Sequence, residues 1–294
     1  AIFRDTFSPG LLRFDGKQQM IPLQIKGIKH KGVGELEGIS RLSKSTYALQ
    51  YNIDGASWLY EAEYREKSKK LRIKTILCGE EPLSNGVMEA YYYDEKKDRF
   101  AISFSTATSP TQLYIISGKN RKKIELQTNE KVLGIDRELL SNSEDASFVA
   151  EDGLRISAKL YMPSPKLEFS GKRPLVYYVH GGPQGQEKPD FGWFSMPLIQ
   201  YLTLNGFAVF VPNVRGSSGY GLSYAKKVDK DCGGKDRLDH VYAMKVLSKD
   251  NRIDTSRAAV VGRSYGGYMS LMLAGRHPEL WKAAVDMFGP YDLL

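Results

Sequence analysis

The chain has 294 residues, with 42 Lys and Arg against 34 Asp and Glu, so its formal net charge is 42 − 34 = +8. Hydrophobic residues make up 41% of it and charged residues 26%. These proportions are ordinary for a globular protein and exclude a disordered chain, a collagen-like fibre and a coiled coil. The length suggests about two domains, each large enough to bury a core of its own.

The positive excess is spread along the chain. Residues 1–140 carry 23 basic and 18 acidic side chains, and residues 141–294 carry 19 and 16. The basic runs at residues 67–70 and 121–123 have acidic residues nearby. This pattern favours solvated faces over a phosphate-binding stripe, so we expect no nucleic-acid partner.

The two cysteines, Cys78 and Cys232, are far apart and show no metal-ligand spacing. A disulfide framework is therefore not expected, and a reducing, cytoplasmic compartment fits best. No apolar run approaches about 18 residues, so we expect no membrane partner. Ala1 opens neither a signal peptide nor a chain with an initiator Met, which fits residues missing upstream.

Residues 1–140 show short strand-like segments with frequent turns. Asp15-Gly16 and Asp54-Gly55 each separate two such segments, as in a β-hairpin. Further strands are expected about every ten residues, at 71–78, 87–93, 99–105, 112–117 and 123–127. This interval is typical of an all-β sandwich, barrel or propeller. A propeller blade takes about 40–45 residues, so the region would form about three blades, fewer than a closed propeller needs.

From about residue 145, strand-like and helix-like segments alternate. The expected strands are 157–161, 175–180, 207–212, 258–262 and 283–288, and the expected helices are 196–205, 238–247 and 265–276. The strands are apolar on both faces, which predicts a mostly parallel sheet covered by helices. We therefore place a domain boundary near residue 140, with domains at 1–140 and 141–294.

One motif carries chemistry. Gly262-Arg263-Ser264-Tyr265-Gly266 is a G-x-S-x-G sequence that follows a predicted strand and opens a predicted helix. In this context the serine sits on a sharp, strained turn with its hydroxyl exposed, and larger residues two positions away would clash. Ser264 is therefore the candidate nucleophile.

A second motif, His180-Gly181-Gly182-Pro183, ends an earlier strand. Acyl transfer needs two donors aimed at the oxyanion, one of them the N–H that follows the nucleophile, here that of Tyr265. Glycines let the other loop approach the substrate carbonyl. His180 is more readily explained as a loop-shaping residue than as a base.

With these residues the chain resembles the prolyl oligopeptidase family over residues 145–294. The resemblance rests on the two motifs above and on Pro212-Asn213-Val214-Arg215-Gly216 and Cys232-Gly233-Gly234. The HGGP loop is similar to the acylaminoacyl-peptidase branch. The resemblance implies an α/β-hydrolase fold (a doubly wound, mostly parallel sheet) preceded by the last blades of a β-propeller. It also implies Ser264 as nucleophile and the N–H groups of Gly182 and Tyr265 as the oxyanion hole.

The family's order of Ser, then Asp, then His is incomplete here. His277 is the single histidine after Ser264, and it would lie about 20 Å along the same helix. It is better explained as a helix C-terminal residue, and Asp286 and Asp292 as structural or solvated residues. We expect the acid and the base beyond Leu294 and expect this piece alone to be nearly inactive.

Other residues have simpler roles. Arg215 is expected to position its loop by ion pairing, and Cys232 to be structural. His30 and His240 are expected at the surface. The aromatic residues Phe191, Trp193 and Phe194 fit an apolar wall near the site and core packing equally well.

Three functions remain open from the sequence. The leading one is a serine peptidase that hydrolyses short peptides, N-acylated ones included, through an acyl-enzyme, with no metal or organic cofactor. The same site suits a carboxylic-ester hydrolase, and a non-catalytic binding protein is the third option. Tyr265 is also a candidate substrate-binding residue. The sequence is also compatible with a homo-oligomer.

Overall fold

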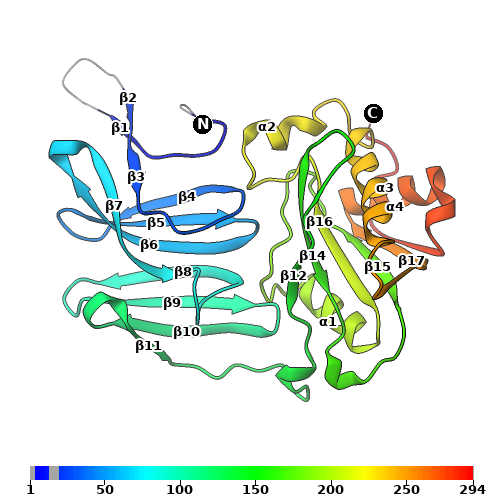
Figure 1. Cartoon of the computed structure of the whole chain (residues 1–294), viewed down its shortest axis with the longest axis horizontal. Helices are drawn as coiled ribbons and strands as arrows, with labels where there is room; N and C mark the ends of the chain where they lie inside the picture. Colours follow the sequence, from blue (N-terminus) through cyan, green and yellow to red (C-terminus); the bar gives the residue numbers. More distant parts are fainter. Residues whose placement is uncertain (1–3, 13–19, 294) are drawn as a thin grey trace. The chain divides into compact units, whose positions relative to one another are not determined.

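The structure, a computed structural model, describes residues 4–12 and 20–293. It divides into two compact units (Figure 1), residues 1–130 with 219–222 and residues 131–218 with 223–294. The predicted limits of 1–140 and 141–294 stay a prediction. No helix in the described ranges is long and apolar enough to cross a membrane.

The first unit consists of strands. Its elements are β1 (Gly10–Leu12), β2 (Met20–Pro22), β3 (Gln24–Lys26), β4 (Gly34–Arg41), β5 (Thr46–Ile53), β6 (Ala56–Arg65), β7 (Lys70–Cys78), β8 (Gly86–Asp94), β9 (Arg99–Thr106), β10 (Ser109–Ser117) and β11 (Lys123–Leu126). Two antiparallel sheets follow chain order, β4 to β7 and β8 to β11, and β3 adds to the first by parallel pairing with β7. β1 and β2 pair antiparallel, while the predicted turn at Asp15-Gly16 lies outside the described residues.

Turn residues and apolar faces explain these sheets. Asp54 and Gly55 both have positive φ, +49° and +85°, which is the geometry that a two-residue hairpin between β5 and β6 needs. A core of buried side chains lies between the two sheets and includes Leu59, Phe100 and Ile102. Each sheet is thus blade-sized and packs on the next, although the sequence suggested about three blades rather than two.

Arg121 contradicts the expectation of a solvated basic run at residues 121–123. Its side chain is buried and donates to Glu61 at 2.8 and 3.1 Å and to Asp98 at 2.7 Å. The guanidinium also lies over the ring of Phe100. Glu61 is 60 residues away in sequence, so a local charge pattern could not reveal this pair.

The second unit alternates strands and helices. Its strands are β12 (Ser143–Asp145), β13 (Phe148–Val149), β14 (Arg155–Tyr161), β15 (Arg173–Val179), β16 (Ala208–Asn213), β17 (Ile253–Arg263) and β18 (Ala283–Met287). Its helices are α1 (Met196–Leu204), α2 (Leu222–Ala225), α3 (Lys235–Leu247) and α4 (Tyr265–Arg276). The sheet order is β12-β14-β16-β15-β17-β18, parallel from β16 to β18.

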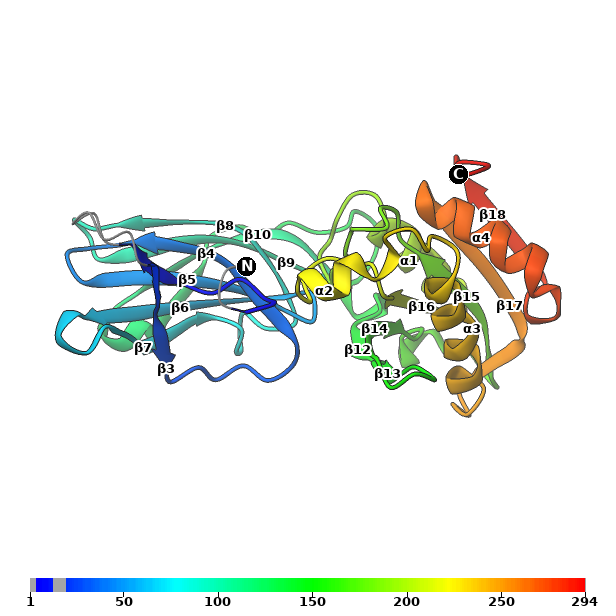
Figure 2. The same cartoon turned by 90° about the horizontal axis from the view of Figure 1, so that it is seen from above.

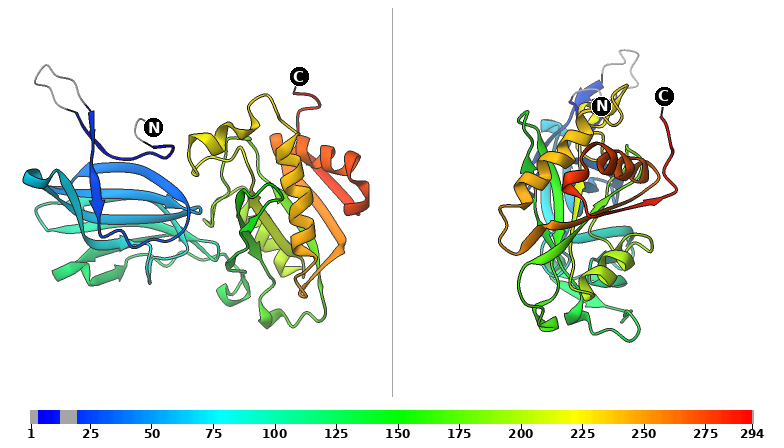
Figure 3. Two further views of the ribbon diagram at one scale, coloured as in Figure 1. Left: turned by 45° about the horizontal axis from the view of Figure 1, so that its top comes forward. Right: turned by 90° about the vertical axis from the view of Figure 1, so that its right-hand side faces the viewer.

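This strand order fixes where the helices lie. The chain moves from β15 through α1 to β16 in one direction, and then from β16 through α3 to β17 in the other. Right-handed crossovers therefore place α1 on one face and α3 and α4 on the opposite face. α3 and α4 lie side by side (Figures 2 and 3). The direction reverses between β15 and β17, which is where open α/β sheets form a crevice at the carboxyl ends of their strands.

The fold class predicted from the sequence is confirmed: an α/β-hydrolase sheet preceded by propeller-type blades. α4 has the predicted bounds, and the five strands predicted in the second unit lie within a few residues of β14 to β18. The sequence did not predict β4, nor the parallel pairing of β3 with β7.

Candidate active site

Ser264 lies at the bend between β17 and α4. Its backbone has φ +56° and ψ −122°, a left-handed conformation that costs a residue with a side chain about 1–3 kcal/mol. The turn is held because the Ser264 N–H donates to the Met287 carbonyl, while the Ser264 carbonyl accepts from Gly267 and Tyr268. The side chain is exposed. The structure thus places the predicted nucleophile on a strained turn with its hydroxyl accessible.

Two glycines permit this bend. A Cβ on Gly262 would collide with the Gly266 carbonyl and lie 2.8 Å from the Val179 carbonyl oxygen. A Cβ on Gly266 would collide with the same Val179 oxygen and lie 2.9 Å from that of His180. The backbone of α4 therefore rests directly on the end of β15, and only glycine fits at either position.

The HGGP loop lies against the nucleophile. β15 and β17 are parallel neighbours, and the last register pair of the two strands is Val179 with Gly262. The loops that follow therefore start side by side at one sheet edge. A Cβ on Gly181 would lie 3.3 Å from the Ser264 Cβ. Gly182, a predicted oxyanion residue, comes next and is exposed with φ +137°, while Tyr265, the other one, directly follows Ser264.

Tyr265 is anchored through its side chain. The ring is buried, and its hydroxyl donates to a carboxylate oxygen of Asp236 and accepts from the Gly233 N–H at 3.2 Å. Burial, then the charge of Asp236, raises the pKa of Tyr265 far above its usual value. Asp236 also accepts the N–H of Arg237 at 2.9 Å at the start of α3. No local pattern other than the preceding glycines indicated this link.

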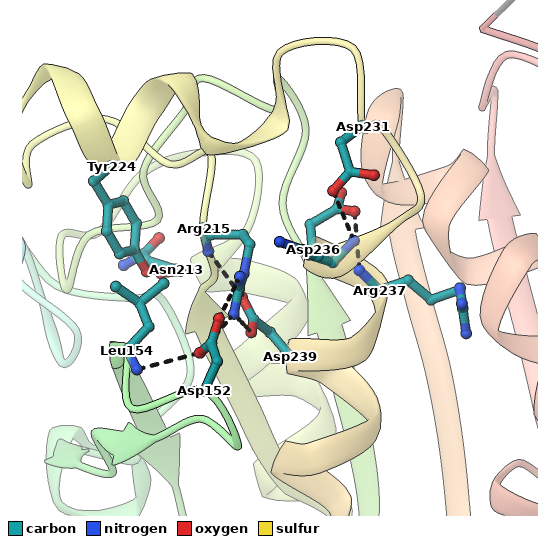
Figure 4. Close-up of polar contacts among 10 residues, drawn as sticks. Asp152, Leu154, Asn213, Arg215, Tyr224, Asp231, Asp236, Arg237 and Asp239 are labelled. Atoms are coloured by element: carbon teal, nitrogen blue, oxygen red, sulfur yellow. Dashed lines mark hydrogen bonds and ion pairs between the residues drawn. The ribbon is translucent and has the colours of Figure 1, made fainter.

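Arg215 holds the loop after β16 by ion pairs, as predicted. Its guanidinium donates to both oxygens of Asp239, at 2.8 and 2.6 Å, and to both oxygens of Asp152, at 2.8 and 3.1 Å (Figure 4). Arg215 and Asp239 are buried, whereas Asp152 is exposed. The hydrogen bonds to Asp239 are the main cause of the raised pKa of Arg215.

That loop in turn holds the HGGP loop. His180 is buried, and its ring nitrogens bond Ser217 Oγ at 2.9 Å and the Gly181 carbonyl at 2.8 Å. The Glu187 N–H donates to Asn213 Oδ1 at 2.8 Å, and Asn213 Nδ2 donates back to the Glu187 carbonyl at 3.0 Å. His180 thus shapes the loop, as expected.

Glu187 has an unusual carboxyl group for a loop residue. Burial raises its pKa to about 7, the charge of Asp190 adds to the rise, and the Ser195 hydroxyl and Arg263 oppose it. Arg263, which precedes the nucleophile, has its guanidinium 3.4 Å from the ring centre of Phe194. Phe194 therefore contacts the residue that leads into the Ser264 turn, while Trp193 is 83% exposed.

Each histidine has a hydrogen-bond partner other than the serine hydroxyl. His277 follows the last residue of α4, and its ring contacts Arg237, so it lies at the far end of the helix as predicted. His30 belongs to the first unit, where its ring contacts Tyr60. His240 was expected at the surface, and this is wrong: its ring is buried on α3 and bonds the Tyr177 hydroxyl at 3.0 Å. Burial lowers its pKa to about 3.

The two candidate acids after Ser264 also have other roles. Asp286 on β18 accepts the Gly289 N–H at 2.7 Å, and it is exposed. Asp292 is exposed near the last described residue. Within the described ranges no group of three or more His, Cys, Asp and Glu residues is arranged to hold a metal ion. The assignment of Ser264, Gly182 and Tyr265 to catalytic roles stays a prediction.

Comparisons with known proteins find similar sequences among peptidases. The prolyl oligopeptidase family matches residues 193–294. An uncharacterised peptidase of Bacillus subtilis, YuxL, is 30% identical over 204 residues, covering 69% of this chain and 30% of YuxL. The acylamino-acid-releasing enzyme of Sus scrofa is 29% identical over 197 residues, covering 64% of this chain and 26% of that enzyme.

A solved structure shows the same fold. The puromycin-hydrolysing peptidase of Mycobacterium tuberculosis superimposes with a TM-score of 0.74 at 20% identity, covering 98% of this chain and 43% of that one. The fold and the strained serine turn define the class, an α/β hydrolase preceded by propeller-type blades. The matching residues 193–294 belong to the prolyl oligopeptidase family. The chain spans about a third of the length of the curated relatives that it matches.

Proposed function

We propose that this chain carries the nucleophile and the oxyanion hole of a serine peptidase. One observation carries the proposal. Ser264 is exposed on a strained turn, and Gly181 of the HGGP loop lies against its Cβ at the carboxyl ends of β15 and β17. A serine that serves only in packing needs neither a left-handed backbone nor two glycine loops around it.

The proposed reaction is acyl transfer to Ser264 and then to water. The serine oxygen bonds to the carbonyl carbon of the peptide and gives up its proton to a base. The carbonyl oxygen becomes an oxyanion that accepts hydrogen bonds from the N–H groups of Gly182 and Tyr265. The carbon–nitrogen bond breaks, the amine leaves with that proton, and water then releases the acid and restores the serine.

The base in this scheme remains a prediction. Each of the four histidines bonds a group other than the Ser264 hydroxyl, so we assign none of them as the base.

Short peptides, N-acylated ones included, are the proposed substrates. Support comes from the name of a relative, the acylamino-acid-releasing enzyme of Sus scrofa, and from YuxL, which is named a peptidase. The same serine and oxyanion hole also serve ester hydrolysis, so the test must separate hydrolysis of amide bonds from hydrolysis of ester bonds.

The test uses a fluorophosphonate probe and kinetics on the full-length protein. We expect strong labelling that Ser264→Ala removes, and no loss in Ser256→Ala, an exposed serine at the start of β17. Persistent labelling of Ser264→Ala would reject the assignment, and no labelling or turnover would indicate a binding protein. Faster hydrolysis of simple esters than of acyl-amino-acid amides would favour an esterase. The 294-residue piece should label weakly, because a triad without its base keeps only a small part of its activity.

A further inference from the structure

The first unit contains a basic cavity that the proposed activity does not use. Its volume is about 720 Å³. The charged residues that line it are Lys26, Lys29, Arg65, Lys70, Arg72, Lys74 and Glu80. Their formal charge is 6 − 1 = +5. A small-molecule site commonly has a volume of about 300–1,000 Å³, so this cavity has a suitable size for a ligand.

The sheet register explains why these cations gather. Lys70 and Arg72 are two residues apart on β7, so their side chains leave the same face of the strand, and Lys74 follows at a register shift. β3 pairs with β7 in parallel, and the register sets Lys26 directly beside Arg72. On the other side of β7, Arg65 of β6 is opposite Lys70. The strands β3, β6 and β7 appear together in Figure 1.

Lys26 with Arg72, and Arg65 with Lys70, are therefore pairs of like charge on neighbouring strands. Like charges directly opposite each other destabilise a sheet. One acid offsets part of it: Glu63 faces Arg72 across β6 and β7, and its carboxylate pairs with Arg65 at 3.3 Å. Among the residues that the structure describes, Lys26, Lys70, Arg72 and Lys74 make no ion pair. A bound anion would relieve this repulsion.

The backbone around the cavity is fixed by a buried side chain. The Tyr60 hydroxyl accepts the N–H groups of Lys29 and His30 at 3.4 and 3.0 Å, just after β3 ends. The ring of Tyr60 is buried. The segment that carries Lys29 is thus held beside β7, and the cations do not depend on a loose loop for their positions.

We propose that this basic cavity binds a small oligophosphate, two or three linked phosphate groups that are either free or part of a nucleotide. Cα atoms two residues apart on β7 are about 6.6–6.8 Å apart, and β3 is about 4.8 Å away. A linked chain of phosphates can therefore pair with more of these cations at once than a single phosphate can. Arg72 can bind one phosphate through two N–H groups, and the lysines act as point charges. Ile73 and Ile76 are the apolar side chains of the lining, and no aromatic ring is available to a base.

The test is calorimetric titration of the purified full-length protein with sodium tripolyphosphate. We expect one site, with binding that weakens as salt rises. Lys26→Gln/Arg72→Gln should raise Kd by about tenfold or more, because it removes the cross-strand cation pair. Lys74→Gln, at a position without a register partner, should give a smaller loss in the same direction.

The matched control is Lys67→Gln/Lys122→Gln, which removes the same charge from exposed residues outside the cavity. It should keep Kd within about twofold. Equal weakening by both double variants would overturn the proposal, since it would mean binding to net charge alone. Orthophosphate binding as tightly as tripolyphosphate would also overturn it, and so would tighter binding of an RNA oligomer.

ATP distinguishes the sources of the phosphate chain. An affinity within about threefold of that of tripolyphosphate supports recognition of the phosphates alone, whichever molecule carries them. Much tighter ATP binding would overturn the description of a site without base contacts. Circular dichroism of each variant confirms that the fold is kept. None of these measurements depends on Ser264, so they stand apart from the peptidase proposal.

Discussion

A serine with a left-handed backbone needs support from its neighbours, and Tyr265 supplies part of it. Tyr265 is the residue whose N–H is the predicted oxyanion donor, and its side chain is fixed by Asp236 and Gly233. The backbone of Tyr265 is therefore positioned by α3 as well as by α4. Asp236 acts in this scheme as a positioning residue.

Tyr265→Phe tests this support. Removing the hydroxyl leaves Asp236 buried with one partner fewer, which lowers the free energy of unfolding by about 1–3 kcal/mol. We expect kcat to fall by about tenfold with KM nearly unchanged, because the N–H is used mainly in the transition state. Steady-state kinetics and urea unfolding measure the two effects.

The control is Tyr268→Phe in the same helix. The Tyr268 hydroxyl is half-buried, and its contact with the Cys232 carbonyl is long, 3.5 Å. This variant should leave kcat and stability close to those of the wild type. If both variants behave alike, the hydroxyl of Tyr265 has no positioning role.

Glu187 gives a pH prediction. Its folded pKa of about 7 is above the ordinary 4.5, so the folded protein keeps this proton at pH values where the unfolded chain has lost it. The stability that the proton provides is complete below pH 4.5 and is lost as the pH rises towards 7. Wild type should lose on the order of 2 kcal/mol relative to Glu187→Gln over this range. Urea unfolding at several pH values measures it, with exposed Glu151→Gln as control, and parallel profiles for wild type and Glu187→Gln would contradict it.

At this scale the sequence was informative where the signal is local. Ser264 and its glycines form one short motif, so their bend could be predicted from residues 262–267 alone. His240 was misplaced because its partner Tyr177 is 63 residues away. The anchor of Tyr265 was missed for the same reason, since Asp236 is 29 residues away.

Among the elements, α4 depends most on close backbone contact. Its first turn rests on the end of β15 through Gly266, while Gly275 near its other end has no atom within 4 Å of an added Cβ. Close packing therefore requires glycine at residue 266 of α4 but not at residue 275. Gly275 is replaceable and Gly266 is not.

Gly266→Ala and Gly275→Ala form a matched pair. We expect Gly266→Ala to lower the free energy of unfolding by about 1–3 kcal/mol or more and to abolish fluorophosphonate labelling, since the new methyl group overlaps the Val179 carbonyl. Gly275→Ala should raise stability by up to about 1 kcal/mol, because alanine favours a helix. Denaturant unfolding and probe labelling test both, and equal stability of the two variants would contradict the packing argument.

The strands followed from the sequence with few errors because hydrophobic runs and turn residues define them locally. β5 and β6 flank the predicted Asp54-Gly55 turn. β4 has few buried residues and little apolar alternation, so it gave a weak signal. The pairing of β3 with β7 is set by contacts 46 residues apart (70 − 24), which no local pattern encodes.

For the whole molecule, the division into two compact units has a thermodynamic consequence. Each unit has a core of its own, so we expect calorimetric unfolding to show two transitions rather than one. Asp239→Asn removes a charge from the buried pair with Arg215 and should destabilise its unit by about 3–5 kcal/mol. The other transition should stay in place. A single transition, or a shift of both, would show that the units unfold together.

The pairing of β15 with β17 also has a consequence for synthesis of the chain. Gly182 and Ser264 are 82 positions apart (264 − 182) although their strands are neighbours in the sheet. At about 5–20 residues per second, a ribosome finishes the glycine loop roughly 4–16 s before it adds the serine. The hydroxyl can meet its predicted donors only after β17 has entered the sheet beside β15. A nascent chain therefore cannot bring Ser264 beside Gly182 until both strands have joined the sheet.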